Sequence, residues 1–223
     1  SDKEPGELQA RRILREIDTT IKSGVDLGIA WLCKGMYFSY MSKPEQMDSA
    51  FKNSITFGAI DAASYFNRSV CYQSYGYFDE AMYGYSLSGD KDAYVEMQRI
   101  LRSTLDIEKY EKHFKSTEQV AEINKLLSNL KKCDLNLNDL KTSLDIFLDI
   151  LRSKKLRFTL SRYSVYEDEY ALFFALRSNI EGLTREVLSE YDKRTSTLEL
   201  FEKSRKLNII MFEHTPYFER ISA

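Results

Sequence analysis

The sequence has few of the residues that interrupt helices or bind metals. It contains three prolines and nine glycines in 223 residues, and eight of the glycines come before residue 90. The second half therefore holds almost no helix breakers, which favours helices there. Only two histidines occur, His113 and His214, and neither has the spacing to a carboxylate that a carboxylate-bridged metal centre uses. No other catalytic motif is present, so we expect no metal site, no cofactor, no catalytic residues and no enzymatic activity.

Long apolar runs and an excess of positive charge are also missing. No run approaches the roughly 20 residues of a membrane-spanning helix, so no transmembrane segment is expected. The formal net charge of −2 argues against nucleic-acid binding, which requires a basic surface. Hydrophobic residues at 43% and charged residues at 30% are typical of a soluble globular protein.

The three cysteines, Cys33, Cys71 and Cys133, are far apart and have no paired spacing. Cys33 and Cys71 stand beside core positions of predicted helices, so we expect buried thiols rather than a disulfide or a metal site. Free thiols favour a reducing compartment and hence a cytoplasmic location. The polar start, SDKEPGE, resembles a tether, and an exported or lipid-anchored protein whose signal has been removed is the alternative.

The segment from Tyr65 to Asp90 has the pattern of a helical hairpin. Spacings of three and four residues put side chains on one helical face, and a glycine between two such runs indicates a turn. The turn falls at Gly76. The two faces consist of Tyr65, Ser69 and Tyr72 on the first helix and Phe78, Ala81, Tyr85 and Ser88 on the second.

The same pattern recurs about 34 residues earlier. Pro44 then suits the first position of the second helix, whereas Met47 replaces Ala81. The pattern does not recur 34 residues later in the sequence. The matching pairs are Trp31 with Tyr65, Gly35 with Ser69, Phe38 with Tyr72, Phe51 with Tyr85 and Ser54 with Ser88. Over roughly residues 28–92 the chain resembles the tetratricopeptide repeat, a family with a 34-residue helix–turn–helix unit. A coincidental hairpin in an ordinary helical bundle is the alternative.

These patterns predict an all-α fold in three parts. Residues 1–26 form an N-terminal tail and a capping helix, with the helix over 7–23 ending at Gly24. Residues 27–90 form two antiparallel hairpins, which the resemblance implies are arranged as a right-handed array. Residues 91–223 form a C-terminal helical region packed on the repeats, either as a bundle of longer helices or as further degenerate repeats.

Capping signals divide the C-terminal region into helices. Asp90 caps a helix to about His113, a capping box from Ser116 to Gln119 opens a helix to Leu130, and residues 136–138 cap the next one. Ser164 with Glu167 predicts a helix to about Tyr191, and Ser196 with Glu199 predicts a last one past Leu207. Residues 156–166 alternate as a strand would, but a helix followed by a turn is favoured there.

The resemblance also implies a binding site. In tetratricopeptide repeats the first helices line a concave groove that receives a peptide or a partner helix. Carried over to this sequence, the groove residues are Ile29, Leu32, Met36 and Tyr40 from the first repeat and Phe66, Val70 and Gln73 from the second. This set is apolar and lacks the Lys and Asn side chains that would grip a terminal carboxylate. We therefore expect an apolar or amphipathic segment as the ligand.

The resulting hypothesis is a non-enzymatic adaptor that binds a peptide or helix of a protein partner. Fifteen tyrosines, many of them in the repeat region, suit such an interface. Two alternatives stay open: a helical subunit of a homo-oligomer or larger assembly, and an enzyme with a small polar pocket between the halves. The groove is either open or filled by a helix of the chain itself.

Overall fold

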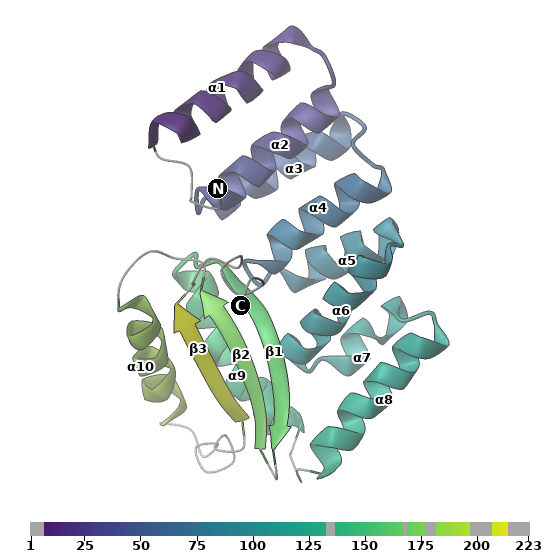
Figure 1. Cartoon of the computed structure of the whole chain (residues 1–223), viewed down its shortest axis with the longest axis vertical. Helices are drawn as coiled ribbons and strands as arrows, with labels where there is room; N and C mark the ends of the chain where they lie inside the picture. The colour runs from purple at the N-terminus through teal and green to yellow at the C-terminus, as the bar shows by residue number, and fades with distance from the viewer. Residues whose placement is uncertain (1–6, 133–136, 167–168, 177–181, 197–206, 214–223) are drawn as a thin grey trace, which may run out of the picture.

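The computed structural model describes residues 7–132, 137–166, 169–176, 182–196 and 207–213. Helices predominate, as predicted, and a small sheet lies near the C-terminal end (Figure 1). No helix within the described ranges combines the length and the apolar character needed to cross a bilayer. The helices are α1 (Glu7–Ser23), α2 (Leu27–Tyr40), α3 (Pro44–Thr56), α4 (Ala62–Gln73), α5 (Phe78–Ser88), α6 (Lys91–Thr104), α7 (Ile107–Tyr110), the 3-10 turn η1 (Glu111–His113), α8 (Thr117–Lys132), α9 (Leu137–Ser153) and α10 (Leu183–Thr195).

Helices α2 with α3 and α4 with α5 form two successive hairpins (Figure 1). The second helix begins at Pro44 in one hairpin and at Phe78, 34 residues later, in the other. A stack of a cation on an aromatic ring recurs at this spacing. Lys34 Nζ lies 4.8 Å from the ring centroid of Trp31, and Arg68 Cζ lies 4.6 Å from that of Tyr65.

The second helices repeat their contacts as well. Ser54 Oγ donates to the Phe51 carbonyl oxygen at 2.8 Å, and Ser88 Oγ donates to that of Tyr85 at 3.1 Å. Two local contacts of the first hairpin thus recur 34 residues later in the second.

Small residues let the helices of each hairpin approach closely. A Cβ atom on Gly35 would lie 2.3 Å from the ring of Phe51, and one on Gly84 would lie 2.1 Å from Ser69 Oγ. Both distances are far inside van der Waals contact. The backbones of α2 and α3, and of α4 and α5, are thus closer than side chains larger than hydrogen would permit at these sites.

The caps predicted at Asp90 and from Ser116 to Gln119 are confirmed, whereas the cap predicted at residues 136–138 begins at residue 136, which lies outside the described residues. Asp90 Oδ1 accepts from the backbone N–H of Asp92 at 2.8 Å. In the capping box the Gln119 N–H donates to Ser116 Oγ at 3.2 Å, and the Ser116 N–H donates to Gln119 Oε1 at 2.8 Å. The helix expected to continue to His113 instead ends at Thr104, because Leu105 adopts a left-handed backbone with φ of 54°.

The helix predicted from Ser164 to about Tyr191 is wrong over its first part, and so is the helix favoured over residues 156–166, whereas the stretch from Leu183 is helical, in α10. Strands β1 (Phe158–Tyr166) and β2 (Glu169–Leu176) form an antiparallel pair there, and β3 (Leu207–Glu213) pairs with β2 in parallel. The physical reason is that this apolar run pairs with a strand on each side. As a strand it buries every second side chain in the core: Tyr170, Leu172, Phe174 and Leu176. Of the last predicted helix, residues 197–206 lie outside the described part, and its continuation past Leu207 is strand β3.

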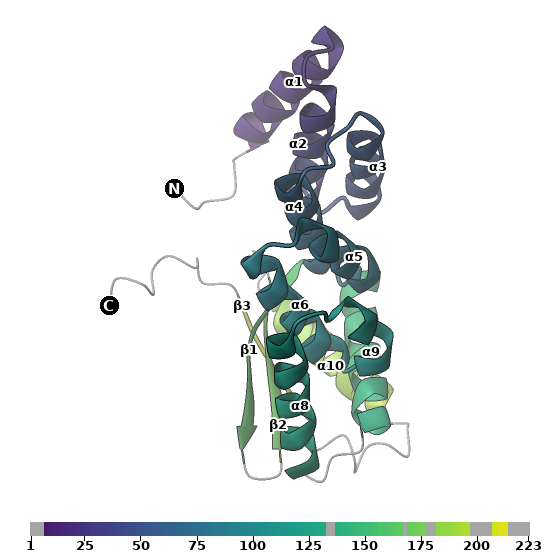
Figure 2. The same ribbon diagram turned by 90° about the vertical axis from the view of Figure 1, so that its right-hand side faces the viewer.

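One face of the sheet is covered by α9 and α10 (Figure 2). The ring centroid of Phe147 on α9 lies 4.9 Å from that of Phe174 on β2 and 5.7 Å from that of Tyr191 on α10. The main hydrophobic core runs without interruption from α5 to β3, across residue 90. A smaller core in the two hairpins contains Leu32, Met47, Phe51, Cys71 and Tyr75.

The cysteines agree with their predicted burial only in part. Cys71 is buried, as predicted, whereas Cys33 is exposed, and Cys133 lies outside the described residues. The buried residues of α2 include Gly28, Leu32, Gly35 and Ser39. Cys33 directly follows Leu32, so the helix turns it by about 100° away from that buried face.

Candidate functional site

A cleft of about 310 Å³ lies between the first helices of the two hairpins, helix α6 and the beginning of strand β1. We call it the hairpin–strand cleft. Its lining includes Met36 and Tyr40 of α2, Phe66, Val70 and Gln73 of α4, Glu96, Arg99 and Ser103 of α6, and residues 157–160 at the start of β1.

The start of β1 lies against the turn between α4 and α5 (Figure 1), and residues of both segments line the cleft. The Phe158 N–H donates to the Ser74 carbonyl oxygen at 2.8 Å. The ring centroid of Phe158 lies 6.3 Å from that of Phe78 in an edge-to-face arrangement. The wall opposite the hairpins is therefore built by main-chain hydrogen bonding and aromatic packing, both of which hold it in place.

The apolar wall of the cleft comes from α2 and α4. Tyr40 is 53% exposed and Val70 is 39% exposed, although both are large apolar side chains. Phe66 is partly buried and packs edge-to-face on Tyr85, with ring centroids 5.5 Å apart. The spacing of Phe66 and Val70, four residues apart, puts both on one face of α4.

Polar groups at the α6 side of the cleft already bind one another. Gln73 Nε2 donates to Glu96 Oε2 at 2.8 Å, and Glu96 also forms an ion pair with Arg99. The hydroxyl of Tyr85 donates to Gln73 Oε1 at 2.6 Å. Burial, with a further contribution from the charge of Glu96, raises the pKa of Tyr85, which keeps this donor protonated. The side-chain amide of Gln73 thus has hydrogen-bond partners within the protein at both its nitrogen and its oxygen.

The cleft brings together five of the seven residues that the sequence placed in a groove: Met36, Tyr40, Phe66, Val70 and Gln73. Leu32 is only 5% exposed and belongs to the smaller core, because it faces α3 and α4. Ile29 is 48% exposed but lies outside the lining of the cleft, near the beginning of α2.

The residues of the opposite wall, above all Arg157, were not predicted from the sequence. The Arg157 side chain stacks on Tyr40, with Cζ 4.6 Å from the ring centroid. The contact joins α2 to the start of β1, which are distant in sequence. No local motif marks it, and the alternation over residues 156–166 was the one available signal of a strand beginning there.

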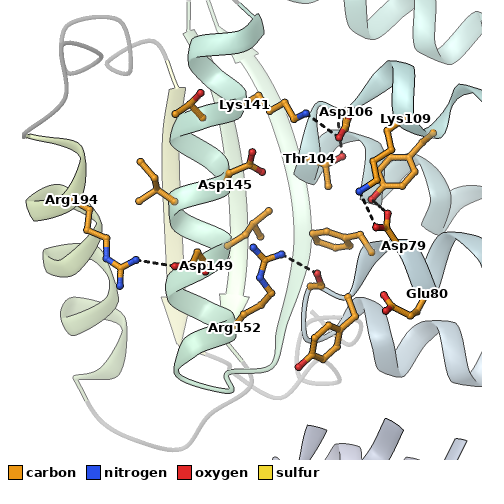
Figure 3. Close-up of a pocket in the computed structure, with 17 residues that line it drawn as sticks. Asp79, Glu80, Thr104, Asp106, Lys109, Lys141, Asp145, Asp149, Arg152 and Arg194 are labelled. Carbon is orange, nitrogen blue, oxygen red and sulfur yellow. Dashed lines mark hydrogen bonds and ion pairs between the residues drawn. The ribbon is translucent and has the colours of Figure 1, made fainter. Parts of the chain in front are cut away.

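A second, larger cavity of about 720 Å³ lies between α5, α7, α9 and α10, and we call it the α9 cavity (Figure 3). Helix α9 turns Lys141, Asp145, Asp149 and Arg152 toward it. Five acidic side chains (Asp79, Glu80, Asp106, Asp145 and Asp149) and four basic ones (Lys109, Lys141, Arg152 and Arg194) line it. Their charges nearly cancel, so the lining has no strong preference for an anion or a cation.

Most of these charges form ion pairs between helices. The nitrogen–oxygen distances are 2.9 Å for Lys109 with Asp79, 3.0 Å for Lys141 with Asp106 and 3.0 Å for Arg194 with Asp149 (Figure 3). Burial alone would raise the pKa of Asp79, but hydrogen bonds from Lys109 and Tyr110 lower it below its usual value. These three ion pairs link α5, α7, α9 and α10 around the cavity, so their role is structural.

Within the described part of the chain, no group of three or more His, Cys, Asp or Glu side chains is arranged to hold a metal ion. No protein-family model, curated protein or solved structure matches the chain.

Proposed function

We propose that this protein is a non-enzymatic interaction module that binds an apolar or amphipathic segment of a protein partner in the hairpin–strand cleft. The observation that carries the proposal is the exposure of Tyr40 and Val70 in a cleft of about 310 Å³. Apolar side chains that converge in a concave site with a few placed polar groups are typical of binding pockets.

The resemblance to tetratricopeptide repeats supports the same reading. The contact between Trp31 and Lys34 recurs 34 residues later as the contact between Tyr65 and Arg68. In that family the first helices of successive repeats line the ligand groove, and α2 and α4 contribute the apolar wall of this cleft. We infer that the hairpins are two such repeats.

A peptide selection tests the proposal on the full chain. A random peptide library displayed on phage is selected on the immobilised protein, and the affinities of the selected peptides are measured in solution. Tyr40→Ala and Val70→Ser should each weaken binding about tenfold, which corresponds to roughly 1.4 kcal/mol of lost contact.

Two matched controls carry the same changes on exposed residues outside the cleft. Tyr83 is 61% exposed and Val95 is 46% exposed. Tyr83→Ala and Val95→Ser should leave the affinity unchanged, and circular dichroism should show the same helical signal for all four variants. Failure to select peptides, or peptides that bind Tyr40→Ala and Val70→Ser as tightly as the unmodified protein, would refute the proposal.

Self-association is a second candidate, favoured by an exposed apolar group at the far end of the first hairpin. A Cβ on Gly28 would lie 2.7 Å from the Phe57 carbonyl oxygen, so the beginning of α2 adjoins the chain after α3. The exposed side chains near this end are Val25, Ile29, Ile55, Phe57 and Ile60. Light scattering on dilution measures the mass, which Phe57→Ser with Ile60→Ser should reduce if this surface joins two copies. A monomeric mass at every concentration would exclude it.

A further inference from the structure

Arg157 is a buried cation at the edge of the hairpin–strand cleft. It is only 7% exposed, and arginine is almost never fully buried unless it is paired. Within the described residues its guanidinium forms no ion pair, and its Nε atom is buried without a hydrogen-bond partner. Its favourable contact there is the stack on Tyr40, at 4.6 Å.

The position of this cation is fixed by its neighbours. Leu156 and Phe158, on either side in the sequence, are buried, and the Phe158 N–H is bonded to Ser74. Burial raises the pKa of Tyr75 to about 12, and the positive charge of Arg157 opposes that rise, so the charge lies near the Tyr75 hydroxyl. The side chain is therefore a fixed part of the cleft wall.

The other charges that line the cleft cancel each other. Glu96 is held by Arg99 and by Gln73, which satisfies its carboxylate. Among the described lining residues, Arg157 is then the one charge without a counterion. A buried donor that lacks an acceptor is unfavourable in the unoccupied site, and an anionic ligand group would remove that cost.

We propose that Arg157 binds a carboxylate of the segment that occupies the cleft, so that the partner presents an Asp or Glu side chain beside an apolar one. This inference rests on the proposed function. The apolar side chain would contact Tyr40 and Val70, and the carboxylate would accept charge-assisted hydrogen bonds from the guanidinium. A side-chain carboxylate fits better than a chain terminus. Terminal carboxylates are captured by nests of free backbone N–H groups, and the Phe158 N–H beside Arg157 is already bonded.

The peptides selected on the full chain test this specificity. They should contain an Asp or Glu, and its replacement by Asn or Gln should weaken binding to the unmodified protein about ten- to a hundredfold. In Arg157→Gln the acidic and amide peptides should bind equally. Lys155→Gln, a loss of the same charge two residues away on an exposed side chain, should retain the preference.

Two outcomes separate this inference from the proposed function. Peptides that are sensitive to Tyr40→Ala but indifferent to the exchange of acid for amide would refute the role of Arg157 and leave the cleft as the binding site. The same holds for peptides that require only a free carboxyl terminus, which amidation of the terminus reveals. Peptides insensitive to Tyr40→Ala would refute both. If Arg157→Gln does not fold, the acid-to-amide exchange on the unmodified protein decides alone.

Discussion

Replacement of Gly35 by alanine should destabilise the protein, although the same change on an open helix surface is stabilising. On an open surface alanine gains about 1 kcal/mol over glycine from helix propensity. At Gly35 the new Cβ would lie 2.3 Å from two ring atoms of Phe51, which is itself fully buried. That ring packs edge-to-face on Tyr72 at 5.4 Å, so it has little room to move.

The magnitude follows from the two opposing effects. Overpacking a core typically costs roughly 1–3 kcal/mol, and an overlap of this size with a buried ring belongs at the upper end. Subtracting the gain of about 1 kcal/mol in helix propensity leaves a net loss of about 2 kcal/mol in the free energy of unfolding.

Gly84 provides a graded comparison, because its close neighbour is a hydroxyl rather than a ring. A new Cβ on Gly84 would lie 2.1 Å from Ser69 Oγ, but Ser69 Cβ would be 3.5 Å away and the hydroxyl can rotate. Gly84→Ala should thus be nearly neutral. The hydroxyl of Ser69 is buried without a hydrogen-bond partner among the described residues, so Ser69→Ala costs little. Gly84→Ala combined with Ser69→Ala should recover the gain of about 1 kcal/mol.

Urea unfolding followed by far-ultraviolet circular dichroism measures all four variants, with the slope of the transition checked for a constant value. Fluorescence of Trp31, the only tryptophan, reports on the first hairpin independently. A stabilisation by Gly35→Ala, of the size expected on an open helix, would show that α2 and α3 are farther apart than described and would refute the reasoning.

Two further predictions concern charge and capping. Partial desolvation at the α9 cavity raises the pKa of the Asp145 carboxyl, although the residue is exposed, so its contribution to stability is present below the ordinary pKa and is lost as the pH rises through the raised one. Asp145→Asn should therefore raise the melting temperature at pH 7, and the advantage should vanish in acid; an equal shift at every pH would contradict this. Ser116→Ala removes the hydroxyl that caps α8 and should cost about 1 kcal/mol in urea unfolding, whereas Ser86→Ala, inside α5, should not.

The hairpins and the middle helices could be predicted because their signals are local. Pro44 begins α3, and Gly76 has a φ of 75° in the turn between α4 and α5. Ser116 and Gln119 form their reciprocal hydrogen bonds within four residues. Each of these features depends on a few neighbouring residues, so the sequence determines it without knowledge of the rest of the fold.

The sheet could not be predicted in the same way. Residues 169–176, EYALFFAL, are almost entirely apolar, and such a run suits a buried strand and a buried helix equally well. The choice is made by partners outside the run. Strand β3, which pairs with β2 in parallel, follows α10 in the sequence. Helix α9, which packs on the sheet, precedes β1 in the sequence. A nearby pair with capping-box spacing, Ser164 and Glu167, then favoured the wrong alternative.

The candidate site likewise has one part that the sequence predicts and one that it does not. The apolar wall, with Tyr40 and Val70, comes from helices that the sequence predicts, whereas Arg157 comes from the beginning of the sheet that it does not. The α5 helix beneath the cleft also buries Phe78, Ala81 and Met82 in the core that continues to β3. The hairpins alone would thus lose both the charged wall and the packing of α5. The proposed specificity for an acidic group would therefore require the assembled chain, even though the apolar contacts come from the two hairpins.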